Sequence, residues 1–509
     1  MNLFVKNRAV LICIALAFSF NLKSQTDSVF IAKQVIPWLH ANNYFRSNPA
    51  AGNTLPYSKM SEVAGSYDYS QADEGLHGVQ AGSGISNYRF LAESFKTEGN
   101  QRFFGKAYFE SGLKKNTAWT DVEDVDLLSP YIVADSVGGT YKSETYFISG
   151  GMAWLKKNAE WAIRGEYKGT VSYRNVDPRP KNTVSRLTIQ PGFVYKSGDW
   201  DYGVGLEYCR YRQNVDIDIE KDSKKIFFYL MQGFGIYNVE FSSFEETFTR
   251  DYKGDLFQTA FQIRHSMPDI SYGFQLKADY NALSVVEEDE RTPYKIKQVF
   301  FNPEGNIEKT FGSQTLFADL SYEFRQSTGN ETQYEPEVVN VSQVLWVPFS
   351  HSDRYRQNTH SAQVNLLIAN KDLTRFSFWE KLHASWTDTE QRYVYPDYKQ
   401  TISDLETNLS IGANLPLKNA SLLQSYLEVG YKKNLSASLY QEVNNTITTG
   451  LIVPDFDYLS ASYSIGKWNV SYGRKLSNRL SAMLSGYIQV YKNSTKDALF
   501  AGSSLTFSF

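Results

Sequence analysis

The feature that most constrains this chain is segment 160–174 (EWAIRGEYKGTVSYR), in which two kinds of side chain alternate without a break. One face carries aromatic, aliphatic and glycine residues: Trp161, Ile163, Gly165, Tyr167, Gly169, Val171 and Tyr173. The other face is mostly charged or hydroxylated: Ala162, Arg164, Glu166, Lys168, Thr170, Ser172 and Arg174. Such a period of two is that of a β-strand. The segment is longer than the five or six residues usual in globular sheets and suits a tilted membrane strand of about ten residues with extensions into water. We therefore predict a strand with lipid on its apolar face and a wet lumen on the other.

The same alternation recurs along the chain, at 201–208, 270–280, 316–325, 480–490 and 499–509. Short turns alternate with longer polar stretches, which we place at 113–142, 175–184, 213–254, 284–313, 388–403 and 441–456. This predicts an all-β fold: a transmembrane antiparallel up-and-down β-barrel over residues 60–509, with short periplasmic turns and long extracellular loops. We expect about eighteen strands, with sixteen or fourteen as alternatives, because 226–241, Trp346 and its flanks, and Gly466 are ambiguous. The barrel must close, since an open sheet edge inside lipid leaves backbone groups without partners.

Composition agrees with a membrane barrel. The 509 residues include 35 Tyr, 33 Phe and 9 Trp, as expected of strands that carry aromatic girdles. The alternative is a secreted tandem of β-sandwiches or a propeller, which predicts shorter strands or a repeat of 40 to 50 residues. We find no such repeat, and we favour the barrel.

Both ends of the chain carry signals. Residues 1–24 are typical of a secretory signal peptide, with Lys6 and Arg8 before an apolar run and cleavage expected after Ser24; an uncleaved N-terminal anchor is the alternative. We predict that residues 25–59 form a short periplasmic or lumenal segment. It is too short for the large plug domain of an energised TonB-dependent transporter. At the other end, Leu505, Phe507 and Phe509 share one face of a final strand, which we expect to pair with the strand near Ser61.

A family resemblance adds to this interpretation. The signal ending in Ser24-Gln25, the barrel pattern and the C-terminal Phe507-Ser508-Phe509 resemble outer-membrane β-barrels of Bacteroidota, which are Gram-negative. Segment 65–84 (GSYDYSQADEGLHGVQAGSG) resembles one uncharacterised family of such barrels, of about 500 residues. The resemblance implies a multi-pass protein of the cell outer membrane, surrounded by outer-membrane lipids. It also implies that the barrel-assembly machinery recognises the C-terminal strand, with Leu505, Phe507 and Phe509 as its signal. It implies no biochemical activity.

Motifs of catalysis are absent from the sequence. The six histidines show no metal-ligand spacing, and neither a Gly-x-Ser-x-Gly elbow nor a phosphate-binding loop occurs. Beyond the signal, only Cys209 remains, so no intramolecular disulfide is expected. The balance of 52 Lys and Arg against 55 Asp and Glu, without a basic block, argues against nucleic acid as a partner. We predict that the protein is not an enzyme, although a triad assembled from distant strands stays an alternative.

Two groups of charged residues are candidate sites. The first is a set of acidic residues in predicted outer loops: Asp121, Glu123, Asp124, Asp126, Asp216, Asp218 and Glu220. Clustered carboxylates suit Ca²⁺ or a divalent bridge to lipopolysaccharide, and we expect no other cofactor. Solvated, mutually repelling loop charge is the alternative, and so is an inward-folded loop that sets cation preference at a constriction.

The second group has mixed sign and is predicted to line the lumen: Arg164, Glu166, Lys168, Arg174, Asp201, Glu207, Lys277, Asp279, Asp319, Glu323 and Arg325. Mixed charge either stiffens the interior or lines a weakly selective channel, and about eighteen strands leave room for water unless something plugs them. We therefore predict a passive channel or facilitator for small solutes. The alternative is a structural or accessory barrel in a complex with a TonB-dependent receptor or a surface lipoprotein.

Overall fold

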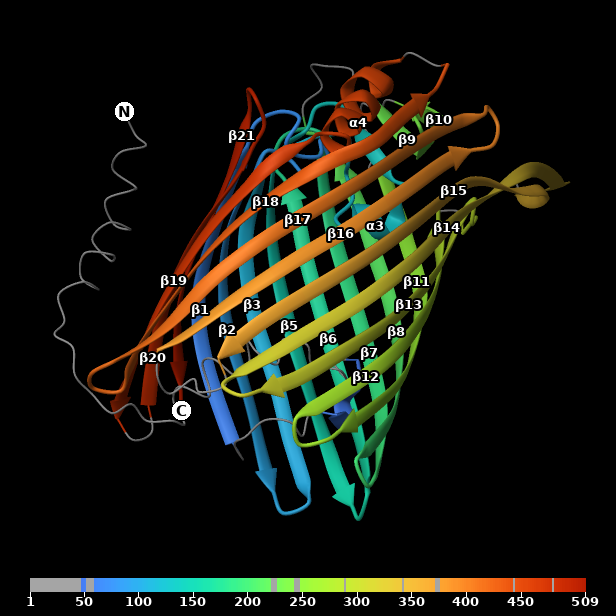
Figure 1. Cartoon of the computed structure of the whole chain (residues 1–509). Coiled ribbons are helices and arrows are strands. Elements are labelled where there is room, and N and C mark those ends of the chain that lie inside the picture. The colour runs from blue at the N-terminus through green and yellow to red at the C-terminus, as the bar shows by residue number, and fades with distance from the viewer. Residues whose placement is uncertain are drawn as a thin grey trace.

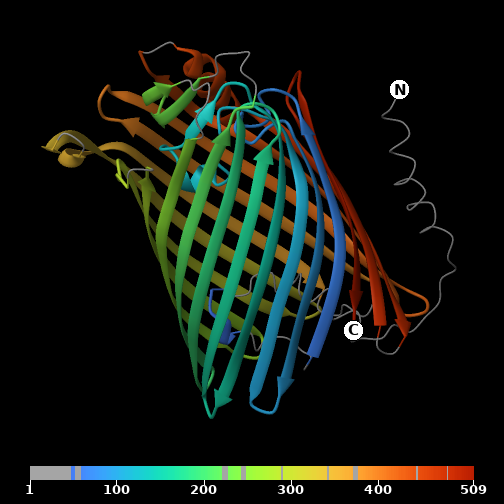
Figure 2. The ribbon, with the colours of Figure 1, turned by 180° about the vertical axis from the view of Figure 1, so that it is seen from behind.

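A computed structural model describes residues 47–51, 59–220, 227–241, 248–287, 290–340, 343–370, 376–442, 445–477 and 480–509. The predicted signal peptide and most of the predicted segment 25–59 lie outside these residues. The described chain forms an 18-stranded antiparallel β-barrel and a separate three-stranded sheet (Figure 1; Figure 2 shows the opposite side). None of the helices in the described ranges has the length and apolar character needed to cross a membrane.

The barrel strands follow the order of the sequence. They are β1 (Lys59–Ala72), β2 (Gly84–Glu98), β3 (Gln101–Thr117), β5 (Gly139–Lys156), β6 (Ala159–Arg174), β7 (Arg179–Ser197), β8 (Trp200–Asp218), β11 (Phe248–Ser266), β12 (Ile270–Val286), β13 (Tyr294–Phe311), β14 (Gln314–Asn340), β15 (Gln343–Asn370), β16 (Ser377–Tyr393), β17 (Tyr398–Leu417), β18 (Ser421–Tyr440), β19 (Tyr463–Ser477), β20 (Leu480–Lys492) and β21 (Asp497–Ser508). The small sheet contains β4 (Val133–Asp135), β9 (Phe228–Gly233) and β10 (Ile236–Phe241). The short helical elements are η1 (Pro49–Ala51), α3 (Val125–Leu128), η2 (Thr448–Ile452) and α4 (Val453–Leu459).

The first and last strands close the barrel. β21 pairs with β1 in a register that runs from Glu62 opposite Ser508 to Ala72 opposite Ala498. Beyond this ladder, the backbone N–H of Phe509 donates to the carbonyl oxygen of Ser61 at 2.8 Å. The predicted pairing of the terminal strand with the strand near Ser61 is thus confirmed, and so is the count of eighteen. Closure gives both edges of the sheet a partner, which a membrane-spanning sheet requires.

The two faces of the wall differ as the alternation predicted. On β6 the aromatic and aliphatic side chains of Trp161, Ile163 and Tyr167 point outward and are 46–48% exposed. Arg164 and Glu166, between them in the sequence, point inward and form an ion pair with 3.0 Å between Nε and Oε1. A closed barrel with an apolar outside and a polar inside is stable only with lipid around it. The protein is therefore a multi-pass β-barrel of the outer membrane.

Three of the predicted long outer loops are wrong. The stretch 175–184 contains the start of β7, which leaves only 175–178 between β6 and β7. The stretch 284–313 contains β13, and 388–403 contains the ends of β16 and β17, which leave only 394–397 between them. In β13 the outward positions Lys295 and Lys297 are charged, which hides the period-two pattern. Pairing with β12 and β14 nevertheless holds this segment as a strand. Tertiary context overrode the local pattern here.

Candidate functional site

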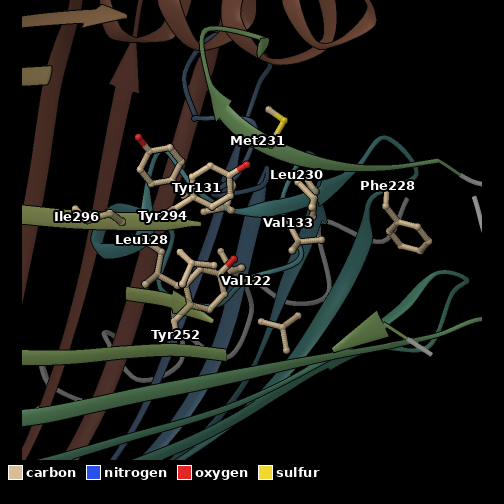
Figure 3. Close-up of a cluster of buried hydrophobic side chains, with 14 of the residues drawn as sticks. Val122, Leu128, Tyr131, Val133, Phe228, Leu230, Met231, Tyr252, Tyr294 and Ile296 are labelled. Carbon is tan, nitrogen blue, oxygen red and sulfur yellow. The ribbon is translucent and has the colours of Figure 1, made fainter. Parts of the chain in front are cut away.

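Folded loops occupy the outer end of the lumen. We call them the outer plug: residues 118–138 with α3 and β4, the β9–β10 hairpin, and η2 with α4. β4 pairs with β9, so two loops that are distant in the sequence share one small sheet. Residues Leu128, Tyr131, Val133, Phe228 and Leu230 form its buried core (Figure 3). The barrel wall contributes inward-facing apolar residues to the same cluster: Val184, Tyr211, Val215, Tyr252, Leu283, Tyr294 and Ile296. The plug is therefore packed against the wall over β7–β13.

A buried ion cluster joins the plug to β6. The guanidinium of Arg174 lies 2.6 Å from Asp135 Oδ2 and 3.7 Å from Asp121 Oδ1, and all three side chains are at most 1% exposed. Tyr141 donates a hydrogen bond to Asp121 Oδ1 at 3.0 Å, and Asn182 Nδ2 donates to the backbone oxygen of Asp121 at 3.1 Å. Burial and the neighbouring Asp135 raise the pKa of Asp121 well above its ordinary value. One arginine thus compensates two buried carboxylates at the base of the plug.

The acidic loop residues are not brought together. Glu123 pairs with Lys114 and Asp124 with Arg186, each at 2.9 Å. Glu220 pairs with Arg179, Asp216 accepts a hydrogen bond from Thr249 at 3.0 Å, and Asp126 and Asp218 are exposed. Within the described ranges, no group of three or more His, Cys, Asp or Glu is arranged to hold a metal ion. Arginine or lysine pairs with Asp121, Glu123, Asp124 and Glu220, so the predicted cation site is not assembled in the part of the chain that the structure describes. Of the alternatives, the loop that carries Asp121 does fold inward.

A short N-terminal strap, residues 47–51, lies inside the barrel against β6, β7 and β8. Asn48 Nδ2 donates to the backbone oxygen of Phe193 at 3.0 Å and to Gln262 Oε1 at 3.1 Å. Beside the strap, Arg102 and Glu160 form a buried ion pair at 3.0 Å, and the same guanidinium donates to Pro49 O at 3.4 Å. The strap is thus held to the wall by polar contacts from several strands.

Two glycines make room for the strap. A Cβ at Gly205 would lie 2.8 Å from the backbone oxygen of Ser47, and one at Gly192 would collide with Asn48 and Pro49. Both glycines face the lumen, where any larger residue would fill the place of the strap. Sequence reasoning missed this site, although glycines on the polar face of adjacent strands were a signal that another backbone approaches closely.

The predicted lumen-lining residues all lie on the inner face but in two environments. Arg174 is buried beneath the plug, and Glu207 contacts Gln190 on the packed side. On β14, by contrast, Glu323 and Arg325 form a 3.3 Å ion pair and remain 40% and 45% exposed. Between β12 and β15 the wall is hollowed by a cavity of about 250 Å³, lined by Lys277, Asn302, Glu304, Asp319, Ser321, Glu323, Ser361 and Gln363. The lumen therefore has a packed side at β6–β12 and a solvated polar side centred on β14.

Comparisons with known proteins place the chain in a family. A family described as a family of unknown function (DUF6850) matches residues 49–509. The chain belongs to this family. DUF6850 thus covers the strap from Pro49 onward and the whole barrel. No curated protein matches the sequence.

Several solved structures are similar to this chain at very low sequence identity. The ferric preacinetobactin receptor BauA from Acinetobacter baumannii is 10% identical, with 89% of this chain and 80% of the receptor covered and a TM-score of 0.42. The copper transporter OprC is 7% identical, with 88% and 80% covered and a TM-score of 0.42. The outer membrane transporter YddB from Escherichia coli is 8% identical, with 89% and 81% covered and a TM-score of 0.36.

Proposed function

We propose that this DUF6850 barrel is a passive passage for small polar solutes, narrowed by the outer plug and the strap. The observation that carries the proposal is the solvated side of the lumen, where charged residues such as Glu323 and Arg325 stay accessible inside the barrel. In a purely structural interior, closely packed side chains would exclude water, as they do on the packed side. Such a passage requires no chemical step from the protein.

The strap is the element whose removal should widen this passage. It occupies lumen space beside β7 and β8, and only glycine at positions 192 and 205 leaves that space free. Its contacts with the wall are hydrogen bonds and one arginine, and its buried apolar contribution is small, with Ala50 packed against Ala153, Ala162 and Val194. A side chain introduced at Gly205 should therefore displace the strap without breaking the barrel.

We expect purified wild-type protein to show small, steady single-channel currents in planar bilayers, and Gly205→Val to raise the conductance. Displacement of the strap is measured separately, with Ala50→Cys in a Cys209→Ser background. Ala50 is fully buried, so a membrane-impermeant maleimide should label it only in Gly205→Val. The control is Gly165→Val on the outer face of β6, where a Cβ meets nothing within 4 Å. The proposal would be overturned if neither wild type nor Gly205→Val carried single-channel current, although the barrel was folded and the strap displaced in Gly205→Val.

A second candidate is an accessory barrel that binds an outer-membrane receptor or a surface lipoprotein. The β14–β15 hairpin favours it, because these strands of 27 and 28 residues extend beyond the rim of the barrel (Figure 1). Near its tip, Val338 is 71% exposed and Phe349 is 57% exposed, which suits contact with another protein. Electrical silence together with a partner that copurifies, and is lost when the hairpin is shortened, would support this candidate.

The closure of the outer plug should depend on pH through Asp455. This residue of α4 accepts a hydrogen bond from the backbone N–H of Val79 at 2.7 Å, which ties the plug to the β1–β2 loop. Burial raises its pKa from 3.8 to about 6, against the lowering effect of that hydrogen bond. Because docking of α4 raises the pKa of Asp455, the protonated carboxyl stabilises the docked plug. This contribution is complete below pH 3.8 and is lost as the pH rises through about 6.

We therefore expect α4 to be more firmly docked at pH 4.5 than at pH 8. A spin label at the exposed position Asp457, in a Cys209→Ser background, should be less mobile at the acidic pH. In Asp455→Asn the mobility should be nearly independent of pH. An equal pH response in both proteins would show that another group controls the docking of α4.

A further inference from the structure

The solvated cavity between β12 and β15 is lined by one ammonium group and one carboxylate that form no direct ion pair. Among the described residues, Lys277 on β12 forms no ion pair within 4 Å, although the carboxylate of Asp279, two positions along the strand, interacts with it electrostatically. On the neighbouring strand β13, Glu304 has no cationic partner within 4 Å in the described chain and accepts a 3.4 Å hydrogen bond from Gln275 Nε2. The cavity thus offers one ammonium group and one carboxylate without a direct ionic partner.

The other two carboxylates of the cavity are already engaged. Glu323 is paired with Arg325 at 3.3 Å, and Asp319 accepts a hydrogen bond from Asn365 Nδ2 at 2.9 Å. Next to the cavity, Asn306 faces Asp319 in the strand register; it is 7% exposed, and its Oδ1 has no hydrogen-bond partner in the described chain. An additional acceptor therefore lies beside the carboxylate of Glu304. This arrangement leaves acceptors for an ammonium group near Glu304 and a single donor cation at Lys277.

We propose that this cavity binds a small zwitterion, a molecule of amino-acid size with one ammonium and one carboxylate group. A plain cation would leave Lys277 without a direct partner, and a plain anion would leave Glu304 without one, whereas a zwitterion provides a partner for each. Both side chains are half-buried, and hydrogen bonds to charged groups contribute more than those between neutral groups. A volume of about 250 Å³ accommodates such a molecule together with some water. The inference rests on the proposed passage, in which this cavity would be the site that selects the solute.

The test measures binding of four probes to the purified barrel by ligand-observed NMR. L-Serine is the zwitterion, ethanolamine lacks the carboxylate, lactate lacks the ammonium group, and glycerol is neutral. We expect serine to bind more tightly than the other three. Lys277→Met and Glu304→Gln should each weaken serine binding about tenfold, the equivalent of about 1.4 kcal/mol. Ethanolamine should respond to Glu304→Gln and not to Lys277→Met.

The matched control is Lys297→Met, which removes a lysine from the exposed outer side of β13 and should leave serine binding unchanged. Should a single variant fail to fold, the exchange Lys277→Glu with Glu304→Lys keeps both charges and should retain serine binding. The inference would be overturned if serine did not bind or if glycerol bound equally well. It would also be overturned if neither Lys277→Met nor Glu304→Gln weakened serine binding. Ion currents are recorded on the same protein, so a barrel that conducts without binding serine refutes only the inference. A barrel that binds serine but carries no ion current refutes only the proposed passage.

Discussion

Replacing Phe507 and Phe509 with aspartate, or deleting Phe509, is expected to reduce membrane-embedded protein to a small fraction of wild type. β21 pairs with β20 on one side and β1 on the other, so it holds the seam that closes the barrel. Phe507 and Phe509 lie on the outward face of β21 with Leu505, where lipid would surround them; Phe507 is half-buried and Phe509 is 50% exposed. Carboxylates at positions 507 and 509 weaken insertion, and the loss of Phe509 removes its backbone hydrogen bonds to Ser61. Heat-modifiable migration of membrane fractions on gels measures the folded form.

The control for this prediction is Phe311→Asp. Phe311 ends β13 at a short turn and is 44% exposed on the outer face, much like Phe509, but its strand is not at the seam. We expect this variant to insert nearly as well as wild type. Undiminished insertion of the Phe507 and Phe509 variants would refute a special role of the terminal strand, and an equal loss in Phe311→Asp would show that any outward charge has the same effect.

Arg174→Met is expected to release the outer plug. The substitution leaves Asp121 and Asp135 buried without their cation, and breaking a buried pair in this way typically costs about 3–5 kcal/mol. The plug is a part of the chain held by packing and by this cluster, so it should open while the barrel stays closed. Limited proteolysis within 118–138 on intact cells should become rapid, and single-channel conductance should rise.

Two further variants separate this effect from a general loss of stability. Arg212→Met removes a comparable ion pair, 2.9 Å from Asp251, but Arg212 is 58% exposed, so the change should cost at most about 1 kcal/mol. Adding Asp121→Asn and Asp135→Asn to Arg174→Met removes the uncompensated charges and should restore much of the protection. A plug that stays resistant to protease in Arg174→Met would mean that apolar packing alone holds it.

The candidate sites were predictable to different degrees from the sequence. Alternation assigned the inner face to each lumen-lining candidate, including Lys277 and Glu323, because a strand sends successive side chains to opposite sides. The acidic run at 121–126 was correctly placed in an outer loop, but its partners Lys114, Arg174 and Arg186 belong to wall strands and could not be inferred. Their pairing depends on the loop folding inward, which leaves no periodic pattern in the sequence.

The packed side of the lumen was hidden for the same reason. Asn48 and Gln262 lie 214 positions apart, and β4 and β9 are separated in the sequence by the four barrel strands β5 to β8. Such contacts depend on how far each loop reaches once the wall is closed. The sequence shows glycine at positions 192 and 205, but only the structure shows that these glycines leave space for the strap.

The sequence by itself determined the wall: strands of period two, an apolar outside, a polar inside, and a terminal strand that pairs with the first. Lipid enforces these features at every residue, because each side chain must suit one of two solvents and each backbone group must find a neighbour. Only the tertiary structure decided what the wall encloses, namely the strap, the plug and the solvated cavity with Lys277 and Glu304. Inside the barrel, water or protein can satisfy a polar side chain equally well, so local sequence does not choose between them.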